Sequence, residues 1–166
     1  MRILTLVFWT LATLFLPGCD GISDLLPQST VEPPSAEWSA MLAAINTIRA
    51  EGQTCGNDYH APAEPLAWSG ALEAAAQRHT EDMAEHEYFD HVGRDGSTVG
   101  DRVSREGYAW RRVGENIARY QNSVADVVED WAESPAHCAN LMNPGFVEMG
   151  AAEENLYWTH VMGSPR

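Results

Sequence analysis

The stretch from Trp131 to Gly150 constrains the fold more than any other part of the chain. Within it, Ser134 and Pro135 form a helix-start signal, because serine accepts hydrogen bonds from free N–H groups and proline fits the first helical turn. His137 then lies near a helix N-terminus, where the helix dipole favours the neutral imidazole that a metal ligand or a general base needs. Taken alone, the residue is better explained as a histidine that only fills space and forms a hydrogen bond, and only the neighbouring motif residues change this interpretation.

Length and charge limit the classes of protein that the chain can belong to. Its 166 residues favour one domain with a real core. The formal net charge is −14, from 24 acidic against 10 basic residues, and all of the basic residues are arginines. An acidic surface of this kind repels phosphates and anionic headgroups, so we expect no nucleic-acid partner and no direct binding to membrane headgroups.

The first 19 residues predict export. Arg2 precedes an apolar run from Ile3 to Leu16, which is too short to span a membrane comfortably and is typical of a signal peptide. The run ends in Leu-Pro-Gly-Cys, which resembles a bacterial lipobox and predicts a lipid on Cys19. A plain secretory signal and an uncleaved anchor are the alternatives. A protein of the cell envelope, or a periplasmic or extracellular one, follows from this segment, with membrane attachment only through the lipid.

The rest of the chain divides into a tether and a folded domain. Residues 20–34 contain proline and serine without a sustained period, which indicates a linker. Residues 35–166 carry the amphipathic pattern of a folded domain.

Cys55 and Cys138 are the cysteines that remain once Cys19 carries a lipid. Two thiols in an oxidising compartment predict a disulfide between them. A metal site formed by Cys138 and the adjacent His137 is the weaker alternative, because neighbouring residues on a helix point in different directions.

The pattern of apolar residues predicts helices first and two strands near the end of the chain. Helices are expected from Ser35 to Gly52, from Ser69 to about Phe89, over 101–106 and from Ser123 to Trp131. Strands are expected over 146–152 and 156–162, a polar loop over 53–65, and a turn with a short extended piece over 112–118.

Two polar residues stand out in these segments. His79 shares a stripe with the apolar side chains of its helix, which indicates a histidine buried in the core. Glu115 lies between a glycine and an apolar run, and a surface turn residue is the plain interpretation of it.

Four short motifs in a fixed order resemble the CAP superfamily, the cysteine-rich secretory, antigen 5 and pathogenesis-related-1 group, in its bacterial form. They are Tyr88-Phe89-Asp90-His91, Gly114-Glu115-Asn116-Ile117-Ala118, Trp131-x-x-Ser134-Pro135-x-His137-Cys138-x-Asn140, and Tyr157-Trp158. The resemblance covers about Trp38 to Gly163. It implies an α+β fold, a three-layer α-β-α sandwich with a small antiparallel sheet and a cleft.

In family members the cleft holds two histidines and two glutamates that can bind a divalent cation. The motifs that match place His91, Glu115 and His137 in this set. The fourth position has no clean match: Ser134 falls at the expected place, and Glu133 lies one residue before it. Two imidazoles and a carboxylate suit zinc best, and the alternative is a polar network that stabilises the cleft.

Three functions follow as hypotheses. The first is an exported, lipid-anchored CAP domain that binds an apolar lipid or sterol-like ligand, with a divalent metal as an optional component. The second is a metal-assisted hydrolase of peptide or ester bonds, with Glu115 as the candidate general base. The third is a structural envelope protein that presents an acidic surface to a partner.

Overall fold

The computed structural model describes residues 34–166. The helices are α1 (Ala36–Glu51), α2 (Gly70–Glu85), α3 (Val99–Arg105), α4 (Val124–Glu133) and α5 (Pro135–Leu141). The strands are β1 (Gln53–Cys55), β2 (Asp58–His60), β3 (Ala67–Trp68), β4 (Trp110–Arg119), β5 (Glu148–Glu154) and β6 (Tyr157–Pro165).

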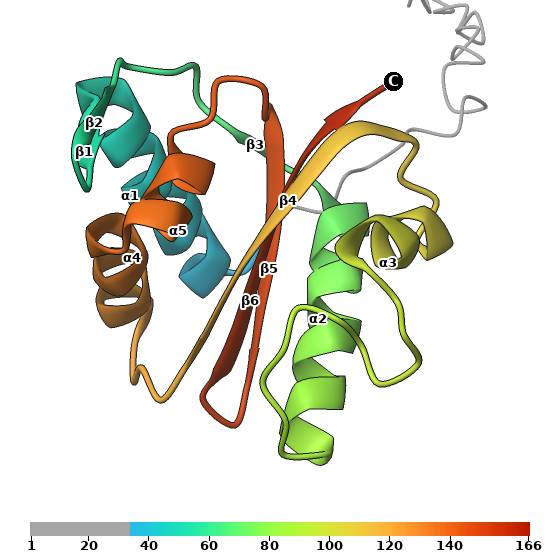
Figure 1. Cartoon of the computed structure of the whole chain (residues 1–166). Coiled ribbons are helices and arrows are strands. Elements are labelled where there is room, and N and C mark those ends of the chain that lie inside the picture. The colour runs from blue at the N-terminus through green and yellow to red at the C-terminus, as the bar shows by residue number, and fades with distance from the viewer. Residues whose placement is uncertain (1–33) are drawn as a thin grey trace, which may run out of the picture. The chain divides into compact units, whose positions relative to one another are not determined.

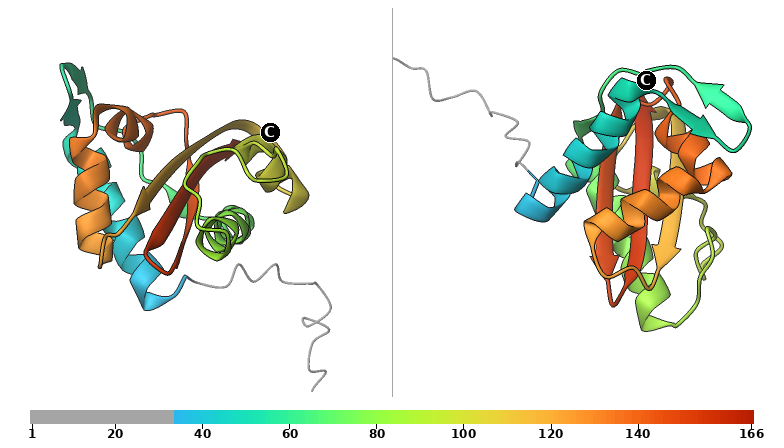
Figure 2. Two further views of the ribbon diagram at one scale, coloured as in Figure 1. Left: turned by 60° about the horizontal axis from the view of Figure 1, so that its bottom comes forward. Right: turned by 90° about the vertical axis from the view of Figure 1, so that its left-hand side faces the viewer.

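A four-stranded sheet separates two layers of helices, with α1, α4 and α5 on one face and α2 and α3 on the other (Figures 1 and 2). The strand order is β3-β5-β6-β4, so β4 forms one edge. The predicted three-layer sandwich is confirmed. One detail differs from the expected antiparallel sheet, because the two-residue β3 pairs with β5 in parallel.

Side chains of consecutive residues in the inner strands point to opposite faces of the sheet and so pack against the two helix layers alternately. Met149 and Ala151 of β5 pack into the core on the α1 side. Ala152 of β5 and Val161 of β6 pack into the core on the α2 side.

Local signals fix helix α1 at both ends, as predicted. The Ser35 side chain accepts a hydrogen bond from the Trp38 N–H at 3.3 Å, and Gly52 ends the helix with φ +75°. Such a positive φ favours glycine. Apolar side chains on one face, including Met41 and Ile45, are fully buried.

The Arg49 guanidinium on α1 is fully buried and bonds to backbone carbonyls instead of a carboxylate. Its Nε donates to Glu64 O at 2.8 Å, and Nη1 donates to Leu141 O at 2.5 Å. Nη2 donates to Phe146 O at 3.2 Å. One side chain therefore joins α1 to the segment before β3 and to the α5–β5 connection.

The segment predicted as a polar loop contains a short hairpin, β1–β2, and the disulfide lies next to the turn of this hairpin. Cys55 of β1 is bonded to Cys138 of α5 with their Cα atoms 5.4 Å apart, which confirms the predicted bridge. The sequence separation is 83 residues. Closing a loop of this length is worth roughly 4–5 kcal/mol in the chain-entropy model.

Strand β4 is the main correction to the predicted elements. Instead of a turn with a short extended piece, residues 110–119 form a ten-residue strand paired with β6. Polar residues occupy the middle of this strand because other elements supply partners for them, and these partners are far away in the sequence.

The predicted signal peptide with Cys19 lies outside the described residues, as does the tether except for Pro34. These remain predictions. From residue 34 to residue 166, no helix is both long and apolar enough to cross a membrane.

Gly150 permits the close packing of α2 on the sheet. A Cβ at this position would lie 2.1 Å from the Glu73 backbone N, a contact that would force the helix away from β5. We expect Gly150→Ala to lower the free energy of unfolding by about 3 kcal/mol, as overpacking does. The matched control is Gly70→Ala, because a Cβ there meets nothing within 4 Å. Urea denaturation of both variants makes the comparison, and equal stabilities would contradict it.

Candidate functional site

Glu115 is buried in the middle of edge strand β4, with its side chain only 3% exposed. Residue 115 pairs with Val161, and residue 116 pairs with His160. Because consecutive strand residues point to opposite faces, Glu115 faces the α2–α3 layer and Asn116 faces the layer that contains α5. The interpretation of Glu115 as a surface turn residue is therefore wrong.

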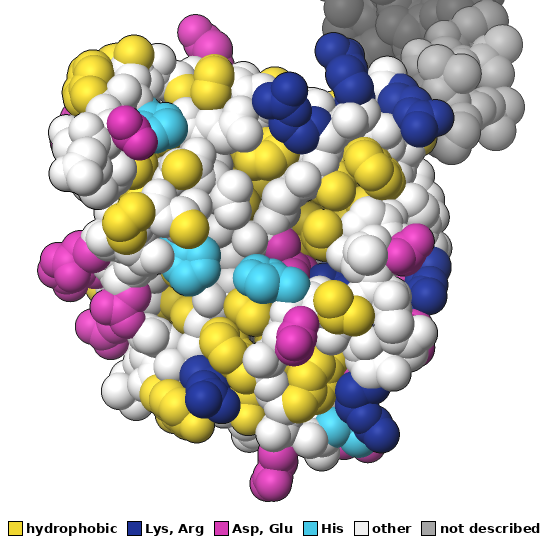
Figure 3. Space-filling view, in the orientation of Figure 1, with side chains coloured by type: hydrophobic (Ala, Val, Ile, Leu, Met, Phe, Trp, Pro, Cys, Tyr) yellow, Lys and Arg dark blue, Asp and Glu magenta, His cyan; other side chains and the backbone are white. Residues whose placement is uncertain are grey.

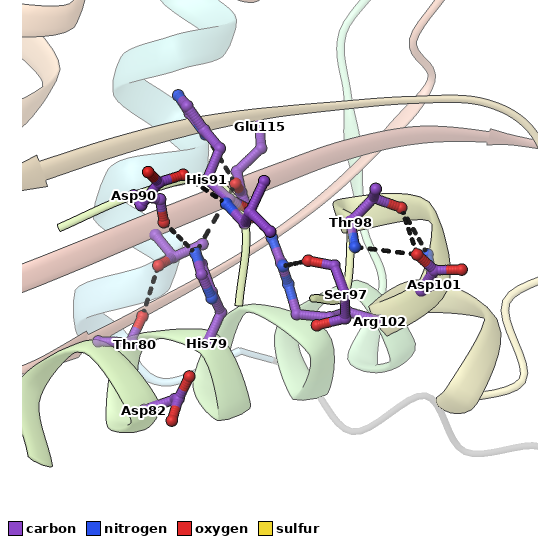
Figure 4. Close-up of polar contacts among 12 residues, drawn as sticks. His79, Thr80, Asp82, Asp90, His91, Ser97, Thr98, Asp101, Arg102 and Glu115 are labelled. Carbon is purple, nitrogen blue, oxygen red and sulfur yellow. Dashed lines mark hydrogen bonds and ion pairs between the residues drawn. The ribbon is translucent and has the colours of Figure 1, made fainter. Parts of the chain in front are cut away.

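Two cationic or potentially cationic groups hold the Glu115 carboxylate (Figure 4). Arg102 Nη2 donates to Oε2 at 2.6 Å, and His91 Nδ1 donates to Oε1 at 2.8 Å. The Arg102 guanidinium also donates to the backbone carbonyls of Ser97 and His91. It therefore fixes both the carboxylate and the segment that carries His91.

Helix α3 places Arg102, a residue that the sequence analysis did not identify as part of the site. Thr98 and Asp101 form a capping box that fixes the start of the helix. From this start, Val99, Arg102 and Val103 follow the three-four spacing of a buried face. That spacing is a signal from which the burial of Arg102 could have been inferred.

His79 of α2 is buried as predicted, and it also belongs to the surroundings of Glu115. Its Nε2 lies 2.9 Å from Asp90 O and therefore carries the proton of that hydrogen bond. The same nitrogen is 4.0 Å from Glu115 Oε1.

The charges around Glu115 shift the pKa values of its neighbours in opposite directions. Burial raises the pKa of Glu115, but the hydrogen bond from His91 and the charge of Arg102 outweigh it, so the pKa is lowered. The hydrogen bond to Glu115 raises the pKa of His91. Burial, and then the charge of His91, lower the pKa of His137.

Helix α5 brings His137 to the opposite side of β4. The Asn116 side chain donates to His137 O at 3.2 Å, and Asn140 Nδ2 donates to Asn116 Oδ1 at 2.9 Å. Asn140 also donates to Glu115 O at 3.3 Å. The asparagines of two sequence motifs therefore dock α5 on the edge strand.

The structure assembles the predicted residues into a site that lies on both sides of the edge strand. His91 and Glu115 are in contact, and His137 is within electrostatic range of His91. Among residues 34–166, no group of three His, Cys, Asp or Glu side chains is arranged to hold a metal ion. Of the two candidate fourth members, Glu133 is exposed, whereas Ser134 lines a hollow beside His137.

Two surface hollows adjoin the histidines. One, of about 390 Å³, lies beside His137, and its wall includes Phe89, Ile117 and Trp131. The other, of about 340 Å³, is lined by His91, Val92, Thr98, Val99 and Glu115. Figure 3 shows histidine side chains in the middle of this face, with hydrophobic surface next to them.

The three-layer sandwich is the architecture that the motifs implied, and two of the motif residues, Glu115 and His137, lie on its strand β4 and helix α5. Residues 42–155 match the family model of the CAP domain, described as the cysteine-rich secretory protein family. The chain belongs to this family.

Relatives and solved structures agree with this assignment. The protein YkwD of Bacillus subtilis is 29% identical over 133 residues, which are 79% of this chain and 49% of that protein. The membrane protein YlbC of the same organism is 31% identical over 94 residues, 57% of this chain and 27% of that protein. The chain thus spans half or less of the length of both relatives.

Among solved structures, an extracellular protein with an SCP domain from Bacillus anthracis superposes with a TM-score of 0.67 and 26% identity, over 75% of this chain and 39% of that one. An outer surface protein from Borrelia burgdorferi also gives 0.67, at 17% identity, over 81% and 97% of the two chains. The second likeness shows the fold alone.

The contacts of Glu115 predict the effect of removing its charge. Glu115→Gln leaves the buried Arg102 charge without its counter-charge, which typically costs about 3–5 kcal/mol of stability. We also expect the pKa of His91 to fall, because its hydrogen-bond partner is no longer anionic. Denaturant unfolding and an NMR titration of the histidine rings measure the two effects. Glu133→Gln, at an exposed position, is the control, and an unchanged His91 titration in Glu115→Gln would contradict the assignment.

The sign of the pH dependence follows from the same shifts. Folding raises the pKa of His91. The contribution of His91 to the free energy of unfolding is therefore full at pH values below its ordinary pKa of about 6.5, and it is lost as the pH rises through the raised pKa. Folding lowers the pKa of Glu115. The contribution of Glu115 to the free energy of unfolding is therefore present at pH values above its ordinary pKa of about 4.3, and it is lost as the pH falls through the lowered pKa. Glu115→Gln removes both dependences.

Proposed function

We propose that the protein is an exported, lipid-anchored CAP-domain module that binds an apolar lipid or sterol-like ligand at the face bearing His91 and His137. The leader with Cys19 supports export and anchoring. The observation that carries the binding proposal is the concentration of exposed apolar side chains around the two hollows.

A cluster of solvent-exposed apolar side chains usually marks a binding surface. Phe89 and Tyr120 border the hollow beside His137 and are 38% and 65% exposed. Val92, in the hollow beside His91, is 49% exposed. The apolar part of a ligand would cover these side chains, and its polar end would meet His137 and Arg119, which line the same hollow as Phe89. Small-molecule sites usually have this composition, with mostly apolar walls and a few polar groups that orient the ligand.

Arg119 adds a charged wall to the same hollow. Its guanidinium lies 4.9 Å from the ring centroids of both Phe89 and Tyr120. A cation that contacts two aromatic rings is pre-organised, and it suits the carboxylate end of a fatty acid.

A divalent metal fits this site only as an optional component. Both Glu115 oxygens are already engaged, one of them by Arg102, so a cation would be held by the His91 and His137 rings. Glu115 would then orient His91 from behind, as carboxylates commonly do for histidine ligands. When bound, zinc supplies Lewis acidity, which is the chemistry that the alternative of a hydrolase needs.

The apolar hollow predicts a selective loss of lipid binding. We expect Tyr120→Glu to weaken the binding of a fluorescent fatty acid about tenfold, because a carboxylate at the rim opposes an apolar chain and the fatty acid's own charge. Tyr59→Glu is the matched control, since Tyr59 is 68% exposed on β2, and it should leave the affinity unchanged. Equal affinities of both variants would refute this placement of the ligand.

Zinc titration separates the remaining alternatives. We expect a calorimetric titration to show one weak site that is lost in His91→Ala and in His137→Ala, while fatty-acid binding persists in both variants. Hydrolysis of ester or peptide substrates that requires zinc and both histidines would favour the hydrolase instead. If both variants lose stability and neither ligand binds to the wild-type protein, the structural role is the better explanation.

A further inference from the structure

Another pocket, lined mainly by charged side chains, shares no residue with the two hollows beside His91 and His137. It has a volume of about 440 Å³, within the range of small-molecule sites. Its walls come from α2, the 93–97 segment and α3. Four of the ten arginines of this acidic chain line it, against three carboxylates: Arg78, Arg94, Arg102, Arg105, Asp82, Asp95 and Glu106.

Two of the lining residues are buried side chains with an unused polar atom. His79 and Arg102 are 1% and 5% exposed. His79 Nδ1 and Arg102 Nε have no hydrogen-bond partner within residues 34–166. Figure 4 shows both side chains extending toward Glu115. Because buried polar groups are nearly always paired, a donor and an acceptor left free beside one pocket indicate a ligand that satisfies them.

The types of the two atoms define the group that would pair with them. His79 Nε2 uses its proton on Asp90 O, so the neutral ring presents Nδ1 as an acceptor. Arg102 Nε–H is a donor. A hydroxyl group both donates and accepts, so hydroxyl groups match both atoms, whereas a carboxylate oxygen would leave Nδ1 unpaired.

The rim of the pocket has one guanidinium without an ionic partner among the described residues. Asp95 is paired with Arg105 at 2.7 Å, and Glu106 is paired with Arg78 at 2.5 Å. The Asp82 carboxylate accepts a hydrogen bond from the Tyr88 hydroxyl. The Arg94 guanidinium makes no ion pair or hydrogen bond with any residue from 34 to 166, which leaves it available for an anion.

We propose that this pocket binds a hydroxycarboxylate of the size of a sugar acid. Ligand hydroxyls donate to His79 Nδ1 and accept from Arg102 Nε–H, and the ligand carboxylate pairs with Arg94 at the rim. Guanidinium groups recognise carboxylates well because their donors match the two oxygens. This inference does not depend on the proposed lipid site, which uses different walls.

Three probes test the proposal without changing the buried residues. Calorimetric titration of the purified protein compares glucuronate with glucose, which lacks the carboxylate, and with cyclohexanecarboxylate, which lacks the hydroxyls. We expect saturable binding of glucuronate and at least tenfold weaker binding of each analogue. Absence of glucuronate binding, or equal affinity for cyclohexanecarboxylate, would overturn the proposal.

Variants at the rim locate the site. Arg94→Gln should weaken glucuronate binding about tenfold, and Arg111→Gln, at an exposed position of β4 that does not line the pocket, should leave it unchanged. NMR shifts of the Gly93 and Ser97 amides on adding glucuronate should accompany binding. Equal affinities for the two variants, or shifts confined to other segments, would place the ligand elsewhere and refute the assignment.

Discussion

The ion pair between Glu115 and Arg102 is the interaction on which the site depends. A carboxylate that is nearly inaccessible to water is costly unless its charge is compensated and its oxygens are hydrogen-bonded. Here Arg102 supplies the charge, and His91 supplies the second hydrogen bond. Because Arg102 also bonds to the backbone of the His91 segment, the same guanidinium determines where that histidine lies.

The position of Glu115 on an edge strand explains why the site has two sides. Consecutive residues of β4 point to opposite layers, so Glu115 meets α2 and α3 while Asn116 meets α5. The Gly-Glu-Asn sequence therefore connects the two histidines through one strand. The histidines retain different surroundings, and their pKa values shift in opposite directions.

Features with local signals could be predicted from the sequence. The ends of α1 follow from Ser35 and Gly52, the start of α5 follows from Pro135, and the disulfide follows from the number of cysteines. The family resemblance identified His91, Glu115 and His137 as site residues by their motifs.

Features that depend on distant partners could not be predicted in the same way. Strand β4 contains residues that disfavour a strand, and it forms because Arg102 and Asn140 satisfy the polar groups of Glu115 and Asn116. The motif positions likewise do not show that Glu115 already has two partners. The structure adds the contacts of Glu115 with Arg102 and His91, which the motifs alone do not contain.

Arg102 also links the two faces of the His91 segment. Its Nη2 binds Glu115 behind the His91 surface, whereas its Nε is left free beside the arginine-lined pocket. A ligand group bound to Arg102 Nε would interact with the same guanidinium charge that neutralises the Glu115 carboxylate. The two proposed sites are therefore connected electrostatically through one side chain, although the hollows share no lining residue.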